Sequence, residues 1–393
     1  MAMGFEVEIR RRITDNNQTV LIGDTELVQH PWFRLVSDKF NPGNGQYSNM
    51  EYVVGRFDQM AGTDQNAADL VTDRVRAMLM MNDELYAGED LLANLVSNPQ
   101  AGNQAINFYI NATYGNTGNL RVRDCPANDD LRLYVHYTVG FEPSEWRTML
   151  ERIRPVVRPD STQDRARTHL DDGLAVADHI VTNVVNGPIN ATGGQAAAVR
   201  TELRGHLALL YMHATVWIDR TLTLQRNGLQ AANAAQARIT NVVNQLPFEG
   251  GQPKNKIAAL PRARLSQMYG LLSAQSRQIL AANVDPVLDA FSTKVETRHG
   301  LDFPDNFQLN NAVAGTTSLA VYITSGLNGQ NGISQQVLFG GMNETGVDNA
   351  THGHPRVPFE FRSLFAARVT WADLRLDALK VAGWSRDQNR VLT

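Results

Sequence analysis

The amino-acid sequence changes its hydrophobic pattern twice, and this order constrains the fold more than any single motif. Alternating apolar and polar residues, typical of half-buried strands, occur towards both ends of the chain, whereas the middle repeats apolar residues at helical spacing. Strands at both ends that enclose a long helical stretch predict an α+β domain that carries a helical insertion. We therefore expect residues 1–165 and 305–393 to form one α+β domain and residues 166–304 to form the insertion.

The first region mixes predicted strands and helices. Residues Gly4–Arg10 place Phe5, Val7 and Ile9 on one side and charged residues on the other, which is the period of a strand with one buried face. The remaining elements predicted here are strands at Trp32–Val36, Glu51–Phe57 and Leu131–Val139, helices at Ala67–Leu85 and Pro143–Ile153, and a turn at Asn41–Gly45.

The other two regions differ in their periodicity. Residues 166–304 are predicted to be almost entirely helical, with one Gly/Pro-rich link, whereas residues 305–393 return to mixed structure. The helices expected in the middle are Asp178–Val185, Ala196–Leu224, Ala231–Leu246, Arg264–Ala282 and Pro286–Val295, with the link at Pro247–Pro261. The last region is expected to contain strands at Ser318–Ile323 and Val357–Phe361, a loop at Gly326–Gly332 and a helix at Thr370–Ala382.

Composition narrows the classes of protein that remain. The chain has 393 residues, 43% of them hydrophobic, and a net charge of −4, which argues against disorder and against a nucleic-acid or membrane-surface partner. Its one cysteine, Cys125, excludes an intrachain disulfide. The beginning of the chain lacks the pattern of a signal peptide, and no apolar run is long enough to span a membrane. We expect a cytoplasmic protein, or one exported without a signal peptide.

Lysine is scarce in this sequence. Only five of the 36 basic residues are lysines, and the other 31 are arginines. A GC-rich genome explains this bias most simply, although selection against exposed primary amines is an alternative. Either way, the positive charge of a functional site in this chain has to come mainly from arginine or a metal ion.

Two carboxylates lie on the first predicted strand. Glu6 and Glu8 are two residues apart, so their side chains point the same way, about 7 Å from each other. Two like charges gain nothing there in water, but a cation bound between them would compensate both. Mg²⁺ prefers carboxylate oxygens together with substrate phosphates, so the pair is a candidate magnesium clamp. A solvent-facing side of an amphipathic strand is the commoner explanation of such a motif.

Other predicted strands carry further polar groups. Glu51 begins one strand, His136 and Thr138 share one face of another, and Glu360 and Arg362 share one face of a late strand. Each has a structural alternative: His136 as a satisfied core histidine, and Glu360 with Arg362 as an ion pair on a solvated face. A sheet that brings these groups together would form a multi-metal site for phosphate chemistry.

At five segments the sequence resembles the carboxylate–amine ligases of glutamine-synthetase-like fold, in the branch of the amidoligases and glutamate–cysteine ligases. The matching segments follow the family's order: Gly4–Glu8, Met50–Val54, His136–Gly140 and Pro358–Arg362. The segment Leu260–Tyr269 is similar to a helix start in divergent amidoligase-like proteins, some of which are encoded beside bacterial toxin-delivery machines.

The resemblance implies a curved, mostly antiparallel half-barrel sheet and a catalytic domain that uses ATP and Mg²⁺. ATP would phosphorylate a substrate carboxylate, and an amine would attack the acyl phosphate to form an amide. The carboxylate and the amine could belong to small molecules or to protein side chains, and the oligomeric state is open. By analogy, His136 would contact a metal or the nucleotide phosphate, Arg362 would stabilise the transferring phosphoryl group, and the Mg²⁺ ligands would be Glu6, Glu8, Glu51 and Glu360.

Two departures from the family keep other functions open. The surroundings of Glu51 are less polar than in several family members, and no Gly-rich phosphate loop is recognisable in the sequence. A catalytically inactive effector or interaction protein on the same fold is therefore one alternative. A metal-dependent amide hydrolase that uses the same carboxylates is another.

Overall fold

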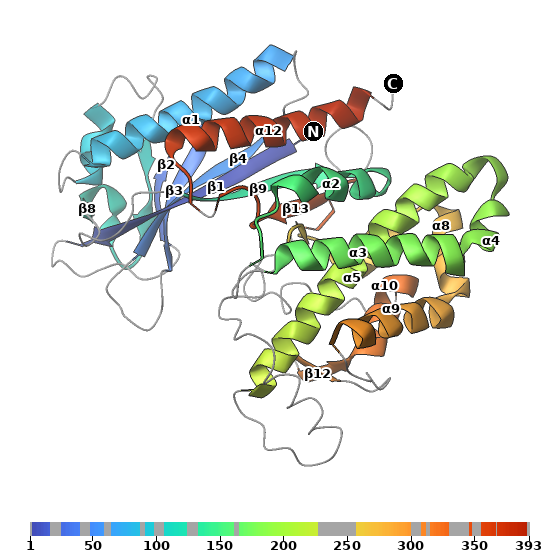
Figure 1. Ribbon diagram of the computed structural model, residues 1–393. Coiled ribbons are helices and arrows are strands. Elements are labelled where there is room, and N and C mark those ends of the chain that lie inside the picture. Colours follow the sequence, from blue (N-terminus) through green and yellow to red (C-terminus); the bar gives the residue numbers. More distant parts are fainter. Residues whose placement is uncertain are drawn as a thin grey trace. The chain divides into compact units, whose positions relative to one another are not determined.

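The chain forms two compact units (Figure 1). Unit 1 comprises Met1–Val139 and Ala366–Thr393, and unit 2 comprises Gly140–Phe365. The computed structural model describes residues 2–15, 25–39, 48–58, 64–86, 91–97, 106–123, 133–160, 165–226, 257–299, 308–311, 315–329, 346–347, 355–366 and 368–390. The units are described separately below.

Unit 1 is built around an antiparallel sheet. Its strands lie in the order β9-β1-β4-β3-β2-β5, with β8 pairing the far end of β1, and each pairing in it is antiparallel. These strands are β1 (Ala2–Thr14), β2 (Thr25–Gln29), β3 (Phe33–Lys39), β4 (Ser48–Asp58), β5 (Asn107–Phe108), β8 (Arg121–Arg123) and β9 (Tyr134–Phe141). A small hairpin joins β6 (Ile110–Asn111) to β7 (Gly115–Asn116), and short 3₁₀ helices span Leu92–Ser97 and Thr117–Asn119.

One face of this sheet is apolar and covered by helices. Residues of odd number in β1, such as Phe5 and Val7, are fully buried, as the alternation in the sequence predicts. Helices α1 (Asp64–Tyr86) and α12 (Trp371–Arg390) lie over this face (Figure 1). The rings of Tyr52 and Trp371 meet edge to face with centroids 6.2 Å apart, which fixes α12 on β4. The opposite face of β1 carries the residues of even number.

Unit 2 is mainly helical. Its helices are α2 (Trp146–Ile153), α3 (Ala166–His179), α4 (Asn186–Asn190), α5 (Ala196–Arg226), α7 (Leu265–Leu271), α8 (Ala274–Ala282), α9 (Val284–His299) and α10 (Leu319–Asn328). A π-helical turn, Ile180–Val184, continues α3, and 3₁₀ helices span Pro143–Glu145, Arg154–Val156 and Gly193–Gln195. The strands are β10 (Leu260–Pro261), β13 (Val357–Phe361) and the pair β11 (Gln308–Asn311) and β12 (Gly315–Ser318).

Helix α5 forms the centre of unit 2. It packs closely on α3 and α2 because glycines stand at both crossings. A Cβ atom at Gly173 would lie 2.7 Å from Met212 Cγ, and one at Gly205 would lie 2.8 Å from Trp146 Cβ. Larger residues at these two positions would force the helices apart.

Strand β9 runs through the boundary between the units. Its residues up to Val139 belong to unit 1, whereas Gly140 and Phe141 belong to unit 2. In the strand order of the sheet, β13 follows β9 and β10 follows β13, so the sheet is open and ends at β10 and β5. The prediction of an α+β fold with a mostly antiparallel sheet is therefore confirmed, but the sheet is not closed into a half-barrel.

Most predicted elements coincide with observed ones. The strands predicted at Gly4–Arg10, Glu51–Phe57 and Val357–Phe361 lie in β1, β4 and β13, and the helix predicted at Ala196–Leu224 is α5. Strand β2 has no counterpart among the predicted elements.

Three predictions of local structure were wrong. The segment Ser318–Ile323 is not a strand, because β12 ends at Ser318 and α10 begins at Leu319. The loop predicted at Gly326–Gly332 begins inside the same helix, which buries Ile323 and Leu327 at helical spacing. The predicted helix Arg264–Ala282 is two helices, α7 and α8, because the extended backbone of Leu272 ends the first and Ser273 caps the second.

Several predictions concern residues outside the described ranges. These are the turn Asn41–Gly45, the helix Ala231–Leu246, Cys125 and residues 247–256 of the Gly/Pro-rich link. The predicted boundaries at 165/166 and 304/305 separate a catalytic domain from its insertion. The division into compact units does not test such a functional boundary, so these boundaries stay a prediction. Within the described part of the chain, no helix combines the length and apolar character needed to cross a membrane.

Candidate functional site

The polar face of the unit 1 sheet brings several of the predicted site residues together. In the antiparallel register, Glu6 of β1 stands opposite His136 of β9, and Glu8 of β1 stands opposite Glu51 of β4. Residues paired across antiparallel strands share a face, so all four side chains lie on the side away from Phe5. We call Glu6, Glu8, Glu51 and His136 the acidic cluster.

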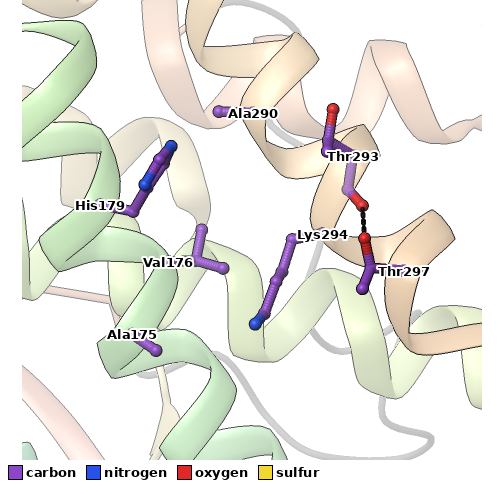
Figure 2. A pocket seen from close by; sticks show the side chains of 7 residues that line it. All are labelled: Ala175, Val176, His179, Ala290, Thr293, Lys294 and Thr297. Carbon is purple, nitrogen blue, oxygen red and sulfur yellow. Dashed lines mark hydrogen bonds between the residues drawn. The ribbon is translucent and has the colours of Figure 1, made fainter.

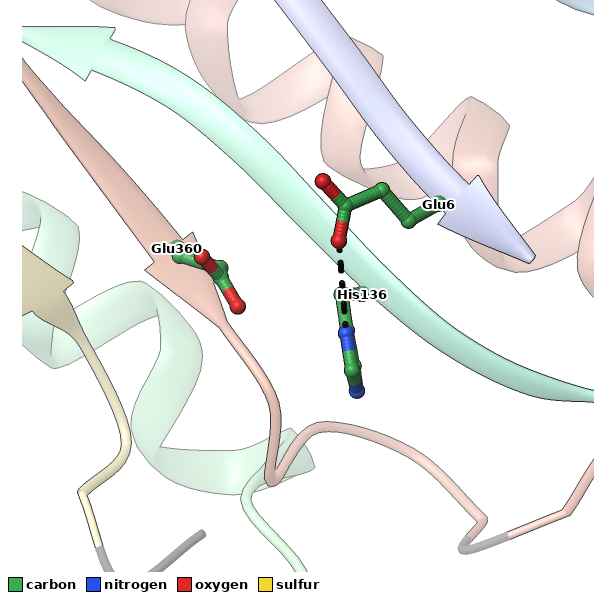
Figure 3. A group of neighbouring side chains, drawn as sticks. All are labelled: Glu6, His136 and Glu360. Carbon is green, nitrogen blue, oxygen red and sulfur yellow. Dashed lines mark ion pairs between the residues drawn. The ribbon is translucent and has the colours of Figure 1, made fainter. Parts of the chain in front are cut away.

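His136 lies at the centre of the acidic cluster. Its Nδ1 is 3.6 Å from Glu6 Oε2 and 3.7 Å from Glu8 Oε1, and the ion pair with Glu6 is drawn in Figure 3. The His136 side chain is 1% exposed, whereas those of Glu6 and Glu8 are 30% and 17% exposed. The Tyr134 ring packs against the imidazole at a centroid distance of 4.6 Å, edge to face. His136 is therefore buried, as expected of a core histidine, but it also faces two carboxylates.

The arrangement of charges fits a bound cation. Glu8 and Glu51 stand directly opposite each other, where Cβ atoms are about 4.5–5.5 Å apart and like charges destabilise a sheet. Three carboxylates with one imidazole form a donor set of oxygen and nitrogen atoms. Mg²⁺ prefers oxygen donors, and an imidazole also suits Mn²⁺ or Zn²⁺. The chemistry of the donors thus fits a divalent cation, with the histidine widening the choice beyond Mg²⁺.

Glu360 is surrounded differently, in unit 2. It lies on β13 opposite Leu260 of β10, and its side chain is 1% exposed. One of its oxygens forms an ion pair with Arg262 Nη1 and the other with Arg362 Nε. The main chain of Arg362 accepts a hydrogen bond of 2.6 Å from Arg158 Nη2, which fixes the segment after β13. A buried carboxylate is tolerated here because two guanidinium groups compensate its charge.

The two ion pairs of Glu360 with arginine would compete with a cation for its oxygens.

Each site residue expected from the sequence can now be placed. Glu6, Glu8, Glu51 and His136 share one face of β1, β4 and β9, and Arg362 directly follows β13 and contacts Glu360. Their roles in catalysis or metal binding stay predictions. Arg262 was not identified as a site residue, although it lies within the segment Leu260–Tyr269 that carries the family resemblance. In the sequence Arg262 is a single arginine that follows a proline, and no motif spacing separates such an arginine from the others in the chain.

Two buried histidines of unit 2 were also not singled out from the sequence. His206 and His213 lie on α5 and are fully buried. Burial lowers the pKa of His206 to about 4, although its Nε2 contacts the carbonyl oxygen of Gly326 at 2.7 Å. Burial lowers the pKa of His213 to about 3. Both imidazoles are therefore neutral at physiological pH.

Comparisons with known proteins do not place the chain in a family. No family model matches the sequence, and no curated protein matches it significantly. A solved structure of a Vibrio cholerae toxin from the MARTX/VgrG family aligns with a TM-score of 0.41 and 12% identity, over 92% of this chain and 93% of that chain. A likeness this weak does not establish a shared fold.

Proposed function

We propose that the acidic cluster binds a divalent cation and that the protein is an ATP- and Mg²⁺-dependent carboxylate–amine ligase of glutamine-synthetase-like fold. The observation that carries this proposal is the convergence of three carboxylates and a buried imidazole on one face of three neighbouring strands. The sequence resemblance supports the same reading, because these residues lie in the segments that match the family's acidic strands. Phosphoryl transfer needs positioning and charge neutralisation more than a protein nucleophile.

The proposed roles follow from where the residues lie. Glu6, Glu8 and Glu51 would hold the cation, and His136 would orient the carboxylates or add a nitrogen donor. When bound, the cation would supply positive charge to the nucleotide phosphates. Arg362 would contact the transferring phosphoryl group, since its ion pair with Glu360 holds the guanidinium in one orientation.

The proposed reaction has two steps. A carboxylate oxygen of the first substrate attacks the γ-phosphorus of ATP, and ADP leaves. The nitrogen of the amine then attacks the carbonyl carbon of the acyl phosphate, inorganic phosphate leaves, and the nitrogen loses a proton to solvent. Both substrates could be small molecules or side chains of a protein.

One observation favours a second candidate function. Both oxygens of Glu360 already meet guanidinium groups, and this arrangement is typical of a structural ion pair. If these ion pairs persist when nucleotide is added, the protein is a catalytically inactive effector or interaction protein on the same fold. In that case the acidic cluster would bind a cation without turnover.

Calorimetry with metal alone tests the cation site. Titration of the full chain with MgCl₂ and MnCl₂ is expected to show saturable binding, and Glu6→Gln or Glu8→Gln is expected to weaken it at least tenfold. Glu26→Gln is the matched control, because Glu26 is a half-exposed carboxylate of the same sheet, paired with Arg34. Equal binding by Glu6→Gln and Glu26→Gln would place the cation elsewhere and remove the basis of the proposal.

Trapping with hydroxylamine tests the ligase activity itself. Hydroxylamine is a strong nucleophile that converts an acyl phosphate into a hydroxamate, so L-glutamate, ATP, Mg²⁺ and hydroxylamine serve as probes. A ligase that accepts these probes forms hydroxamate together with ADP, and Glu6→Gln abolishes both products. Cation binding without nucleotide binding would favour the inactive protein. Amide hydrolysis that needs the metal but no nucleotide would instead identify a hydrolase.

A further inference from the structure

A pocket in unit 2 is lined by none of the candidate site residues described above. It has a volume of about 340 Å³ and opens between α3 on one side and α9 on the other (Figure 2). This volume lies at the lower end of the range for small-molecule sites. The described residues that line it are Ala175, Val176, His179, Ala290, Thr293, Lys294 and Thr297.

The walls of this pocket are mostly hydrocarbon. Val176 is buried at its base, Ala175 and Ala290 contribute methyl groups from the two helices, and the threonines add further methyl groups. The hydroxyl of Thr297 donates to the carbonyl oxygen of Thr293 at 2.7 Å, so it is satisfied within its own helix. An alkyl chain could therefore lie in the pocket without leaving that hydroxyl unpaired.

One charged side chain gives the pocket its electrostatic character. Lys294 of α9 brings an ammonium group, and no carboxylate belongs to the described residues that line the pocket. His179 of α3 also lines the pocket, and its Nδ1 lies 3.1 Å from the amide nitrogen of Asn183. The pocket thus offers an ammonium group beside an apolar wall.

The backbone that follows His179 has an unusual helical geometry. Helix α3 ends at His179, and the next turn, Ile180–Val184, is π-helical. π-Helical turns are rare and are frequently found at functional sites, because the extra residue widens the helix and changes where its side chains point. Lys294 is also one of only five lysines in a chain whose other 31 basic residues are arginines.

We propose that this pocket binds a small amphiphilic carboxylate, with the alkyl chain against Val176, Ala175 and Ala290 and the carboxylate against the ammonium group of Lys294. Charge complementarity favours this head group, since an ammonium group donates charge-assisted hydrogen bonds to a carboxylate. The apolar wall favours an alkyl chain. This site is independent of the acidic cluster, and its occupancy does not depend on the proposed ligase activity.

Titration with matched amphiphiles tests the site in the full chain. Sodium octanoate is expected to bind with a stoichiometry of one, whereas octanol and octylamine, which have the same chain and a different head, bind at least tenfold more weakly. Lys294→Met is expected to weaken octanoate binding about tenfold, the effect of losing one charge-assisted hydrogen bond. Ala290→Leu fills the pocket and is expected to abolish binding.

Two controls keep the result interpretable. Lys380→Met removes a lysine of α12 that pairs with Asp377 in unit 1, and it should leave octanoate binding unchanged. Circular dichroism checks that Lys294→Met and Ala290→Leu retain their helices. The proposal is overturned if octanol binds as tightly as octanoate, if Lys294→Met binds octanoate normally, or if the unmodified chain shows no saturable binding.

Discussion

The two units of this protein differ in how their buried and half-buried charged side chains are paired. In unit 1, Glu8 stands opposite Glu51 and two carboxylates converge on His136, so groups of the same sign gather on one face. In unit 2, Glu360 lies between two arginines and Glu142 pairs with Arg356 at 2.9 Å, so opposite charges meet. The proposed cation would stabilise the first arrangement, whereas the carboxylates of the second already pair with arginines.

Under the proposed function, this difference separates a site that binds a cation from an ion-pair cluster that stabilises the fold. Repulsion between like charges in a native sheet costs stability, and such an arrangement is expected where a ligand compensates it. A buried carboxylate with its own guanidinium partners instead contributes to the fold and resists change. Four measurements, in order of decreasing effect, would sharpen or break this contrast.

Acidification is expected to have the largest effect and to act on unit 2. His206 and His213 have folded-state pKa values of about 4 and about 3, below the usual value of about 6.5. The unfolded state therefore binds more protons below pH 6.5, and the free energy of unfolding falls as pH drops towards 4 and then 3. The loss is about 3 kcal/mol for His206 and ~5 kcal/mol for His213.

Hydrogen exchange measured against pH checks this. Amides of α5 should lose protection at a higher pH than amides of β1, and His213→Met should move the α5 transition to lower pH. Loss of protection in both elements at the same pH, with no response to His213→Met, would mean that the buried histidines do not control acid stability.

Removing the charge of Glu360 is expected to have the next largest effect. Glu360→Gln leaves Arg262 and Arg362 beside a neutral, buried amide, and breaking such a pair costs about 3–5 kcal/mol. Urea denaturation measures the loss. Glu26→Gln, which breaks the half-exposed pair with Arg34, should cost less than about 1 kcal/mol. A gain in stability in Glu360→Gln would show that the ion pairs of Glu360 do not stabilise unit 2.

Cation-linked stabilisation should distinguish unit 1 from unit 2. At a cation concentration about 100-fold above its Kd, binding to the native state raises the free energy of unfolding by ~2.7 kcal/mol. Calorimetric melting with MnCl₂ and with EDTA measures this gain, which should vanish in Glu8→Gln. Retention of the full gain in Glu8→Gln would show that the cation does not bind at the acidic cluster.

The smallest effect concerns the pair Glu8 and Glu51. Without divalent cation, Glu51→Gln removes a like-charge contact between opposite residues and should raise the free energy of unfolding by about 0.5 kcal/mol. With saturating cation the same variant should become less stable than the unmodified chain. A variant that is less stable under both conditions would argue against repulsion between Glu8 and Glu51.

The strands and their faces could be predicted from the sequence because strand periodicity is local. Glu6 and Glu8 follow from a period of two residues, and the same rule places Phe5 and Val7 in the core. The opposition of Glu8 and Glu51 could not be predicted in this way. It depends on the register between distant strands, and that register shifts between Met3 and Phe5.

The features missed in unit 2 depend on tertiary structure. The contact of Arg262 with Glu360 arises from pairing of β10 with β13, almost a hundred residues apart in sequence. His206 and His213 lie on a helix that is apolar on all sides near them, so amphipathicity could not show which face was buried. In α10, β-branched Val321 and Ile323 suggested a strand, but packing of Tyr322 and Leu327 favoured a helix.

The split of unit 1 between the two ends of the chain has a consequence for synthesis on the ribosome. Helix α12, which packs beside α1 and places Trp371 on Tyr52, emerges only after the whole of unit 2 has been made. At ~5–20 residues per second, β1 and β4 wait tens of seconds for the helix that completes the cover of their apolar face. Unit 2, by contrast, is contiguous in sequence and can fold while unit 1 is still incomplete. In a newly made chain, the apolar face of the unit 1 sheet is therefore the surface that stays exposed longest. A chaperone would be needed at that surface.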